Sequence, residues 1–360
     1  MKNRIIHRLR CISQHLKAPS CGIVGGYHLG NLGDMALGEA ISNSCRLAGI
    51  SHGLQTLYNL ERWKSTHSVI IGGGAVTQRI NLKRALDRVP GSRLALCGVD
   101  IEDWDALHDY ADRLLKIPYF SVRSTAQATR ARSLGLKEVA YHPDNVFSLR
   151  NYISKKSPAT TSANRRLVFN ISPRFHLASP DSICDDDNLP HRAPFSVLRD
   201  NYTYLLRSLA TRCIDEGYYM EHIPFTPSDY HIASEILNGF PVRMRPFSPN
   251  PAKIIASLGD DAVWIASRYH SLIFSILGLH PVLPIAYADK SFRLLNDLQI
   301  NQDSIVDLTC LTSRSAVDTV LDRGIPSAPL LDGPSVDEIS FLAINGISKA
   351  IASLGLLGNP

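Results

Sequence analysis

The sequence has no uninterrupted apolar run long enough to cross a bilayer, and no apolar stretch of the signal-peptide type near its N-terminus. It also has no Cys-x-x-Cys pair. Its seven cysteines are odd in number and scattered over 360 residues. This arrangement disfavours a disulfide framework or a zinc cage and favours a reducing compartment. We therefore expect a cytoplasmic protein without a structural metal.

The sequence also has no large excess of one charge. It contains 38 Lys and Arg residues and 33 Asp and Glu residues, which gives a net charge of +5. No basic block is interleaved with aromatic residues, so the sequence gives no signal for nucleic-acid binding. An apolar fraction of 44% is typical of a folded globular chain. The mildly basic balance suits anionic small substrates or a membrane surface.

Residues 1–19 combine basic residues with apolar residues at helical spacing. Such a helix can lie on an anionic bilayer, which would place the protein peripherally at the inner membrane face. A frayed or packed terminal helix explains the same pattern, and both alternatives stay open. The basic positions are Lys2, Arg4, Arg8, Arg10 and Lys17, and the apolar ones are Ile5, Leu9, Ile12 and Leu16.

A length of 360 residues suits two domains. Short β-branched segments alternate with helical ones in both halves, which predicts an α/β protein with parallel sheets covered on both faces. A polar segment rich in Ser, Thr, Lys and Arg marks a linker, and two halves joined in this way form a cleft. The predicted division is a domain over residues 20–150, a linker over 151–166, a domain over 167–330 and a helix over 331–360 that can pack back across the domains.

Residues 265–290 form the most informative segment. WIAS predicts a strand that ends at Arg268-Tyr269-His270, and SLIFSILGL predicts the helix that follows. Open α/β sheets present ligand-binding groups where strands end and helices begin. Arg268 offers a fork of donors to a carboxylate or phosphate, and His270 can carry a proton near neutral pH. The triplet predicts an anion site with an acid/base group. A packed or capping histidine is the structural alternative for His270.

Two glycine-rich turns follow predicted strands in the first half. The turn HLGNLGD contains Gly30, Asn31, Gly33 and Asp34 and leads into a helix predicted from Met35. It lacks the GxGxxG spacing, and no Walker lysine follows. The amides that open the helix can hold an anion. Asp34 is either a catalytic group or the N-cap of the helix.

The second turn contains Gly72, Gly73 and Gly74, which permit close approach of the backbone to a ligand. Arg123 in SVRS and Asp144 in HPDNVF lie at further strand ends. The register of Arg123 with the other strand-end motifs favours the cleft, whereas Asp144 either binds a ligand or caps a turn. The structural alternatives are a tight turn for the three glycines, a surface position for Arg123 and a turn cap for Asp144.

In this order, GNLGD, the triple glycine, VRS, HPDNVF and SRYHSLIFSILGLHPVLPIAYADK resemble the polysaccharide pyruvyl transferase family. The resemblance runs from about Gly22 to about Asp297. The last motif is the most specific, although the gap from Gly278 to Pro281 is one residue longer than the bare family pattern. Ser124 is the other departure. The family usually has Asp there, so a role for an acid at this position is in doubt.

The resemblance implies two Rossmann-like domains similar to B-type glycosyltransferases, with parallel sheets facing across a cleft. It implies phosphoenolpyruvate as the donor and a sugar that gains a pyruvate ketal across two hydroxyls. Such chemistry belongs to the biosynthesis of exopolysaccharides and other cell-envelope glycans. It needs no redox cofactor and no metal.

The matching positions suggest roles for individual residues. Two of them, His270 and Asp34, are expected to be acid and base, in either order. Four residues expected to bind phosphoenolpyruvate are Arg123, Arg268, Tyr269 and Lys290. Weaker candidates for substrate binding are Asn31, Gly30, Gly33, Gly73, Gly74 and Asp144.

Two other functions remain as alternatives. A sugar-nucleotide glycosyltransferase of the same architecture would also use a glycine turn and basic residues, but on a diphosphate. A non-catalytic member that binds a glycan or a partner protein is the second alternative, suggested by Ser124. The acceptor is either a lipid-linked oligosaccharide, a polymer precursor or a small glycoside, and the basic N-terminal segment favours a lipid-linked one.

Overall fold

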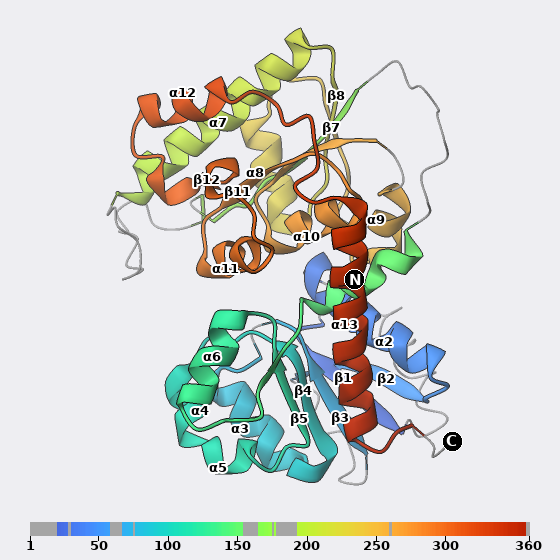
Figure 1. Ribbon diagram of the computed structural model, residues 1–360. Coiled ribbons are helices and arrows are strands. Elements are labelled where there is room, and N and C mark those ends of the chain that lie inside the picture. The colour runs from blue at the N-terminus through green and yellow to red at the C-terminus, as the bar shows by residue number, and fades with distance from the viewer. Residues whose placement is uncertain are drawn as a thin grey trace. The chain divides into compact units, whose positions relative to one another are not determined.

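Two parallel β-sheets, one in each of two units of the chain, organise the fold (Figure 1). The computed structural model describes residues 20–27, 30–57, 67–74, 76–153, 165–174, 176–177, 193–258 and 261–357. The basic segment 1–19 and most of the predicted linker lie outside the described residues. Unit 1 comprises Met1–Asn151, Pro249–Pro251 and Asp337–Pro360, and unit 2 comprises Tyr152–Ser248 and Ala252–Val336.

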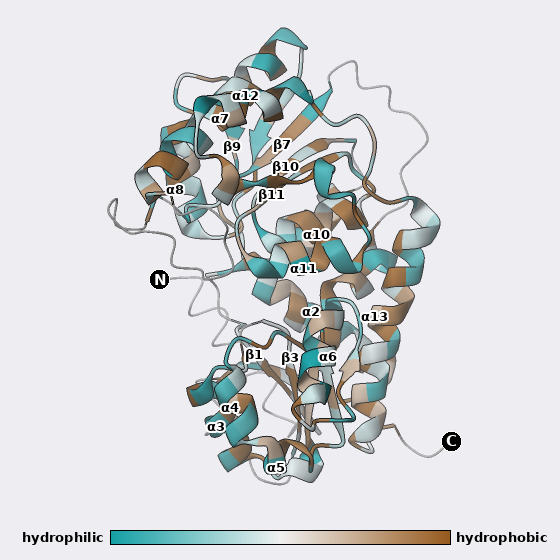
Figure 2. Ribbon diagram, turned by 60° about the vertical axis from the view of Figure 1, so that its left-hand side comes forward, coloured by the Kyte–Doolittle hydropathy of each residue, from teal (hydrophilic) through white to brown (hydrophobic). Residues whose placement is uncertain are grey.

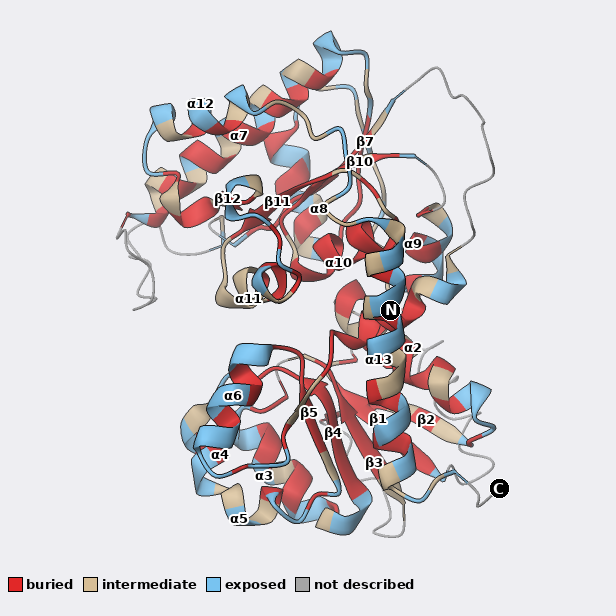
Figure 3. Cartoon of the chain, in the orientation of Figure 1, coloured by how far each residue is buried: buried red, intermediate tan, exposed pale blue. Residues whose placement is uncertain are grey.

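The sheet of unit 1 has six strands, and every neighbouring pair is parallel. They are β1 (Cys21–Gly25), β2 (His52–Thr56), β3 (Ser68–Gly72), β4 (Leu94–Val99), β5 (Tyr119–Val122) and β6 (Ala140–Tyr141). Their spatial order is β2-β1-β3-β4-β5-β6. Apolar side chains fill both faces of the central strands, and Figure 3 shows β1, β3 and β4 as largely buried.

Helices cover the faces of this sheet (Figure 1). They are α2 (Leu32–Leu47), α3 (Arg79–Arg88), α4 (Trp104–Asp109), α5 (Ala111–Leu114) and α6 (Thr125–Ser133), with 3-10 segments η3 (Gly91–Arg93) and η4 (Asn145–Tyr152). Helix α13 (Gly333–Ser353) also belongs to unit 1 from Asp337 onward. Gly346 permits its close approach, because a Cβ there would lie 2.3 Å from Cδ2 of buried His142.

The sheet of unit 2 also has six strands, again all parallel. They are β7 (Arg166–Asn170), β8 (Tyr219–His222), β9 (Val242–Met244), β10 (Val263–Ala266), β11 (Val282–Ala286) and β12 (Val306–Asp307). Their spatial order is β12-β11-β10-β7-β8-β9. This order is that of the Rossmann fold, whereas the order in unit 1 is that of the flavodoxin-like fold.

The helices of unit 2 pack its core between themselves and the sheet. They are α7 (Phe195–Asp215), α8 (Pro227–Ile236), α9 (Pro251–Ser257), α10 (Tyr269–Leu277), α11 (Asp289–Asp297) and α12 (Arg314–Asp322), with 3-10 segments η5 (Gln302–Ser304) and η6 (Leu308–Cys310). All nine residues of α10 are buried. Figure 2 shows this helix as largely hydrophobic, as expected for a helix inside a core.

The predicted α/β class with two Rossmann-like parts and parallel sheets is confirmed. Some details differ from the prediction. Helix α2 begins at Leu32, before the predicted start at Met35, because the side chain of Asn31 caps it. Strand β12 was not predicted, since two residues carry no alternation that a sequence pattern can reveal. Among the described residues, every helix is too short or too polar to span a membrane.

Candidate functional site

In each sheet the strand order reverses once, and polar residues gather where the flanking strands end. The reversal in unit 1 lies between β1 and β3, which lead into the turns with Asp34 and Gly74. The reversal in unit 2 lies between β7 and β10, which end at Asn170 and just before Arg268. Open α/β sheets bind ligands outside the carboxyl ends of the strands at such reversals.

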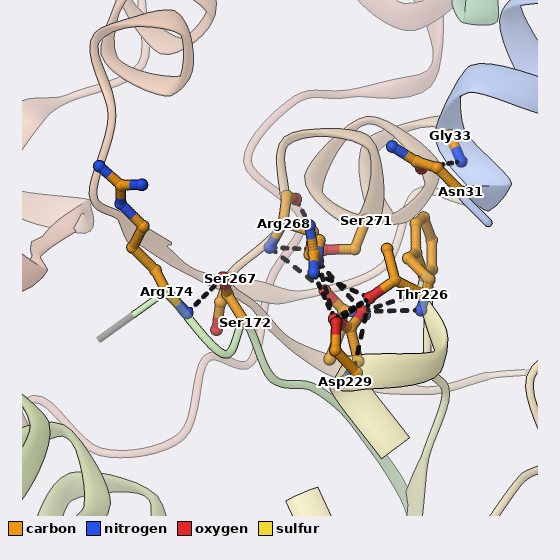
Figure 4. A network of polar contacts seen from close by, with 12 residues as sticks. Asn31, Gly33, Ser172, Arg174, Thr226, Asp229, Ser267, Arg268 and Ser271 are labelled. Atoms are coloured by element: carbon orange, nitrogen blue, oxygen red, sulfur yellow. Dashed lines mark hydrogen bonds and ion pairs between the residues drawn. The ribbon is translucent and has the colours of Figure 1, made fainter. Parts of the chain in front are cut away.

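Arg268 is held at the reversal point of unit 2 by a buried carboxylate (Figure 4). Its Nε donates to both carboxylate oxygens of Asp229, at 3.0 and 3.1 Å, and Nη2 donates to Asp229 and to Oγ1 of Thr226. Its backbone amide donates to Oδ1 of Asn170 at 3.2 Å. Among the described residues nothing accepts from Nη1, and 22% of the side chain is exposed. One edge of the guanidinium is therefore fixed and the other is available.

Asp229 is fully buried, and its carboxylate oxygens are satisfied by hydrogen bonds. It accepts from the amides of Phe225 and Thr226, at 2.9 and 3.0 Å, from Oγ1 of Thr226 at 2.6 Å, and from Arg268. Burial opposes the charge on Arg268, but the Asp229 carboxylate outweighs burial and raises the pKa of Arg268 above its ordinary value. Arg268 is a permanent cation in a fixed orientation.

The predicted neighbours of Arg268 lie in the first turn of α10. Tyr269 is 6% exposed and His270 9%, and their rings meet edge to face at 5.0 Å between centroids. The Ser271 hydroxyl closes the turn by accepting from the Arg268 amide and donating to the Arg268 carbonyl. The helix start thus fixes Arg268 and His270 relative to one another, as the strand-to-helix reading predicts.

A shallow hollow lies beside Arg268, at the carboxyl ends of β10 and β11. Its polar lining residues are Ser267, Arg268 and Ser291, and the others are apolar. The Ser267 hydroxyl hydrogen-bonds Tyr202 at 2.6 Å. Lys290, the predicted binding lysine, precedes Ser291 in the first turn of α11 and is half-buried. No group of the described chain pairs with its ammonium.

In unit 1, Asp34 lies between the two glycine turns. A Cβ on Gly26 would lie 3.4 Å from one carboxylate oxygen of Asp34, and a Cβ on Gly74 would lie 3.7 Å from the other. Gly73 and Gly74 have φ of +66° and +71°, the left-handed region that favours glycine. The carboxylate is half-buried at the reversal point. This position suits a group that acts on a ligand.

The alternative that Asp34 is the N-cap of α2 is wrong, because Asn31 holds that position. The Oδ1 of Asn31 accepts from the amide of Gly33 at 2.9 Å, and Asp34 is the third residue of the helix. Gly30 lies in the turn before the cap. Asn31 and Gly33, both predicted as weak substrate binders, therefore shape the helix start (Figure 4).

Arg123 is enclosed, unlike Arg268. It is 6% exposed and lies between two carboxylates, with Nη2 at 2.8 Å from Asp100 and Nη1 at 2.9 Å from Asp144. Gln127 donates to the other oxygen of Asp100 at 2.8 Å, and Asp144 accepts from the amide of Val146. Both terminal nitrogens of Arg123 are thus paired with buried carboxylates.

Sequence reasoning missed several residues of these clusters. Thr226 and Asp229 form a capping box at the start of α8, and the sequence TPSD after a strand is a signal for one. Asp100 ends the apolar run LALCGV, and an acid at a strand end is a weaker signal. No sequence pattern indicates that Asp229 pairs with Arg268, 39 positions away, or that Asp100 pairs with Arg123, 23 positions away.

Comparison with solved structures finds similarity at low sequence identity. MnaA of S. aureus, solved with UDP, is 13% identical, with 92% of this chain and 93% of that one covered and a TM-score of 0.50. UDP-GlcNAc 2-epimerase of Neisseria meningitidis is 8% identical (94% and 99% covered, TM-score 0.48). E. coli heptosyltransferase WaaC is 12% identical (84% and 99% covered, TM-score 0.39). No curated protein matches the chain.

Residues 31–289 match the family described as polysaccharide pyruvyl transferase. The matched span holds Asp34, Arg123, Asp144, Arg268 and His270, and it ends one position before the lysine of α11. Membership of this family implies transferase activity. Since the match covers most of the chain, the chain belongs to the polysaccharide pyruvyl transferase family.

Proposed function

We propose that the protein transfers the enolpyruvyl group of phosphoenolpyruvate to two hydroxyls of a sugar in a glycan precursor. The products are a pyruvate ketal and phosphate. The observation that carries this proposal is the guanidinium of Arg268, fixed by buried Asp229 with one edge available, two residues before His270. Family membership supports the pyruvyl group as the moiety transferred.

The donor is a small molecule with two anionic groups. Arg268 offers the planar geometry that a carboxylate or phosphate needs, but its pairing with Asp229 leaves that pair without net charge. Lys290 then supplies the positive charge that the pair lacks, and it has no competing partner among the described residues. Tyr269, almost buried beside His270, limits the space at this edge.

The reaction is balanced by two sugar protons. Protonation of the methylene carbon makes the adjacent carbon electrophilic, and the first hydroxyl oxygen bonds to it. The bond from this carbon to the phosphate oxygen breaks, and the second hydroxyl closes the ketal. One hydroxyl proton ends on the new methyl group and the other on phosphate. We assign the acid role to His270 and the base role to Asp34, with the exchanged assignment as the alternative.

Arg123 has a different role in this proposal. Its enclosure by Asp100 and Asp144 makes it a positioning residue for the strand ends of unit 1. Ser124, which replaces the usual acid of the family, is 3% exposed and its hydroxyl has no partner among the described residues. The cluster of Arg123 holds two carboxylates without an acid at this position.

The test is mass spectrometry of sugar acceptors, lipid-linked ones included, after incubation with the enzyme and phosphoenolpyruvate. The expected result is the mass gain of a pyruvate ketal together with equimolar phosphate. Transfer of a sugar from a nucleotide sugar, with no response to phosphoenolpyruvate, would establish a glycosyltransferase instead. Retention of the cellular phenotype by both His270→Ala and Arg268→Ala would point to a non-catalytic protein.

A further inference from the structure

Tyr27 is a buried side chain at the strand-order reversal of unit 1, and the proposed reaction leaves it without a role. It comes two residues after the end of β1, and 2% of it is exposed. Its hydroxyl donates to the carbonyl oxygen of Gly72, the last residue of β3, at 2.7 Å. Since β1 and β3 are neighbours in the sheet, this hydrogen bond joins the ends of the two strands that flank the reversal.

Three glycines make room for the ring of Tyr27. A Cβ on Gly25 would lie 2.6 Å from Cζ of the ring, and a Cβ on Gly72 would lie 2.9 Å from the hydroxyl oxygen. On the side of α2, a Cβ on Gly38 would lie 3.1 Å from Cδ1. All three distances are shorter than a normal van der Waals contact. The ends of β1 and β3 and the helix α2 therefore meet on one aromatic ring.

The hydroxyl of Tyr27 is a donor and not a proton carrier. Burial raises the pKa of Tyr27 well above its ordinary value near 10, and the charge of Asp34 acts in the same direction. The hydroxyl therefore keeps its proton at neutral pH and donates it to the hydrogen bond with Gly72. A group of this kind can hold other groups in place, but it cannot act as the acid or the base of the reaction.

The two segments that Tyr27 joins lead directly into the turns around Asp34. A Cβ on Gly26, the residue before Tyr27, would lie 3.4 Å from one carboxylate oxygen of Asp34, and a Cβ on Gly74 would lie 3.7 Å from the other. Gly74 follows Gly72 by two positions, in a turn whose glycines have left-handed φ. Glycine restrains the backbone little, so such a turn depends on outside contacts for a fixed shape.

We propose that Tyr27 is a positioning residue for Asp34. Its hydrogen bond to Gly72 fixes the glycine turn after β3 against the end of β1, and this holds the carboxylate where it can exchange a proton with a substrate. The inference rests on the proposed function, because that function gives Asp34 its part in proton transfer. Tyr27 should affect the rate of transfer and not the binding of phosphoenolpyruvate, which the proposed function assigns to Arg268 and Lys290.

The test is the variant Tyr27→Phe of the full-length protein, which keeps the ring and removes only the hydroxyl. We expect kcat for transfer from phosphoenolpyruvate to fall about tenfold to a hundredfold, since a small displacement of a catalytic group can cost that much. KM for phosphoenolpyruvate should stay within about twofold of the wild-type value. In hydrogen exchange read by mass spectrometry, the peptide that contains Gly72 and Gly74 should exchange faster, and this readout needs no substrate.

The matched control is Tyr119→Phe. It makes the same change in the same sheet, but at the first residue of β5, the end of the strand away from the turns. Its kcat and its exchange around Gly72 should equal those of the wild type. Circular dichroism measures the thermal unfolding midpoint of both variants. Midpoints above the assay temperature ensure that a lower kcat is not a loss of folded protein.

The outcomes that overturn the inference differ from those that overturn the proposed function. An unchanged kcat in Tyr27→Phe, an equal loss in Tyr119→Phe, or unchanged exchange around Gly72 would each remove the positioning role and leave the proposed function intact. A higher KM for phosphoenolpyruvate without a lower kcat would also remove it. A wild-type protein that transfers nothing from phosphoenolpyruvate to any acceptor would overturn the proposed function and, with it, the part of Tyr27 in catalysis.

Discussion

Two arginines at strand ends differ in how much of the guanidinium group remains available after it pairs with carboxylates. Arg123 lies between Asp100 and Asp144 and is 6% exposed, so both of its terminal nitrogens are paired. Arg268 meets the single carboxylate of Asp229 and keeps an exposed edge. We therefore propose that the arginine positions strand ends in unit 1 and binds the ligand in unit 2.

Replacing Arg123 by Met should destabilise the fold strongly. The change leaves Asp100 and Asp144 buried without their shared cation, and breaking a buried pair costs about 3–5 kcal/mol. Urea unfolding followed by circular dichroism measures the loss. The double variant Arg123→Met/Asp144→Asn should recover part of it, because one buried charge is removed. A single variant as stable as the wild type would show that the cluster does not hold the strand ends.

His222 makes stability depend on pH. It ends β8, is fully buried, and neither ring nitrogen has a partner among the described residues. Burial lowers the pKa of His222 to about 3, below its ordinary value near 6.5. Between about pH 3 and pH 6.5 the unfolded chain therefore binds a proton at His222 that the folded chain does not bind. Stability is complete above about pH 6.5 and falls as the pH drops toward 3.

The variant His222→Leu should have a shallower dependence in this window. The difference in slope from the wild type should approach about 1.4 kcal/mol per pH unit, the value for one proton. Denaturant unfolding at several pH values between 4 and 7 measures it. His231→Ala, at an exposed histidine of the same unit, serves as the matched control. Equal slopes in wild type and His222→Leu would contradict the assignment.

At the scale of elements, the glycine turn after β3 brings a left-handed backbone next to Asp34, a candidate catalytic group. Gly74 has φ of +71°, and a side chain there would contact Asp34. Gly217 has nearly the same φ, +74°, but nothing lies within 4 Å of its Cβ position. Substitutions at Gly74 and Gly217 therefore separate the cost of the left-handed backbone from an effect on the Asp34 carboxylate.

Gly74→Ala and Gly217→Ala should each lower the free energy of unfolding by about 1–2 kcal/mol, because both place a side chain in the left-handed region. Only Gly74→Ala should also lower kcat/KM for transfer from phosphoenolpyruvate, since its methyl group meets the Oδ1 side of Asp34. Steady-state kinetics on both variants decide this. Equal activity in the two variants would contradict this prediction.

The elements themselves could be predicted from sequence, and their side-chain partners could not. Apolar runs and glycine turns indicated most of the strands, and the strand-to-helix step located Arg268 and His270 at the start of α10. The partner of Arg268 lies 39 positions away, across a parallel crossover. Such pairings depend on strand order, and strand order is set by long-range packing that one sequence does not display.

At the scale of the whole molecule, α13 gives unit 1 part of its core from the far end of the chain. Ala343, Ile347, Ala350 and Ile351 are buried at a helical spacing that forms one apolar face. Arg150 also pairs with Asp337 at 2.9 Å. Unit 1 therefore depends on residues that follow all of unit 2 in sequence.

Deleting residues 337–360 should weaken unit 1 more than unit 2. The apolar face of α13 is lost from unit 1, and side chains such as His142 lose their cover. Hydrogen exchange read by mass spectrometry should show faster exchange in β4, β5 and β6, with β7 and β10 unchanged. Uniform acceleration in both sheets would mean instead that the two units unfold as one.

The late arrival of α13 also sets an order of events during synthesis. Domains generally fold as they leave the ribosome, the N-terminal one first. Here the first unit to emerge is the last that can be completed, since its closing helix leaves the ribosome after the second unit. The nascent protein thus carries an uncovered apolar surface for most of its translation, and that surface is where we expect chaperones to bind.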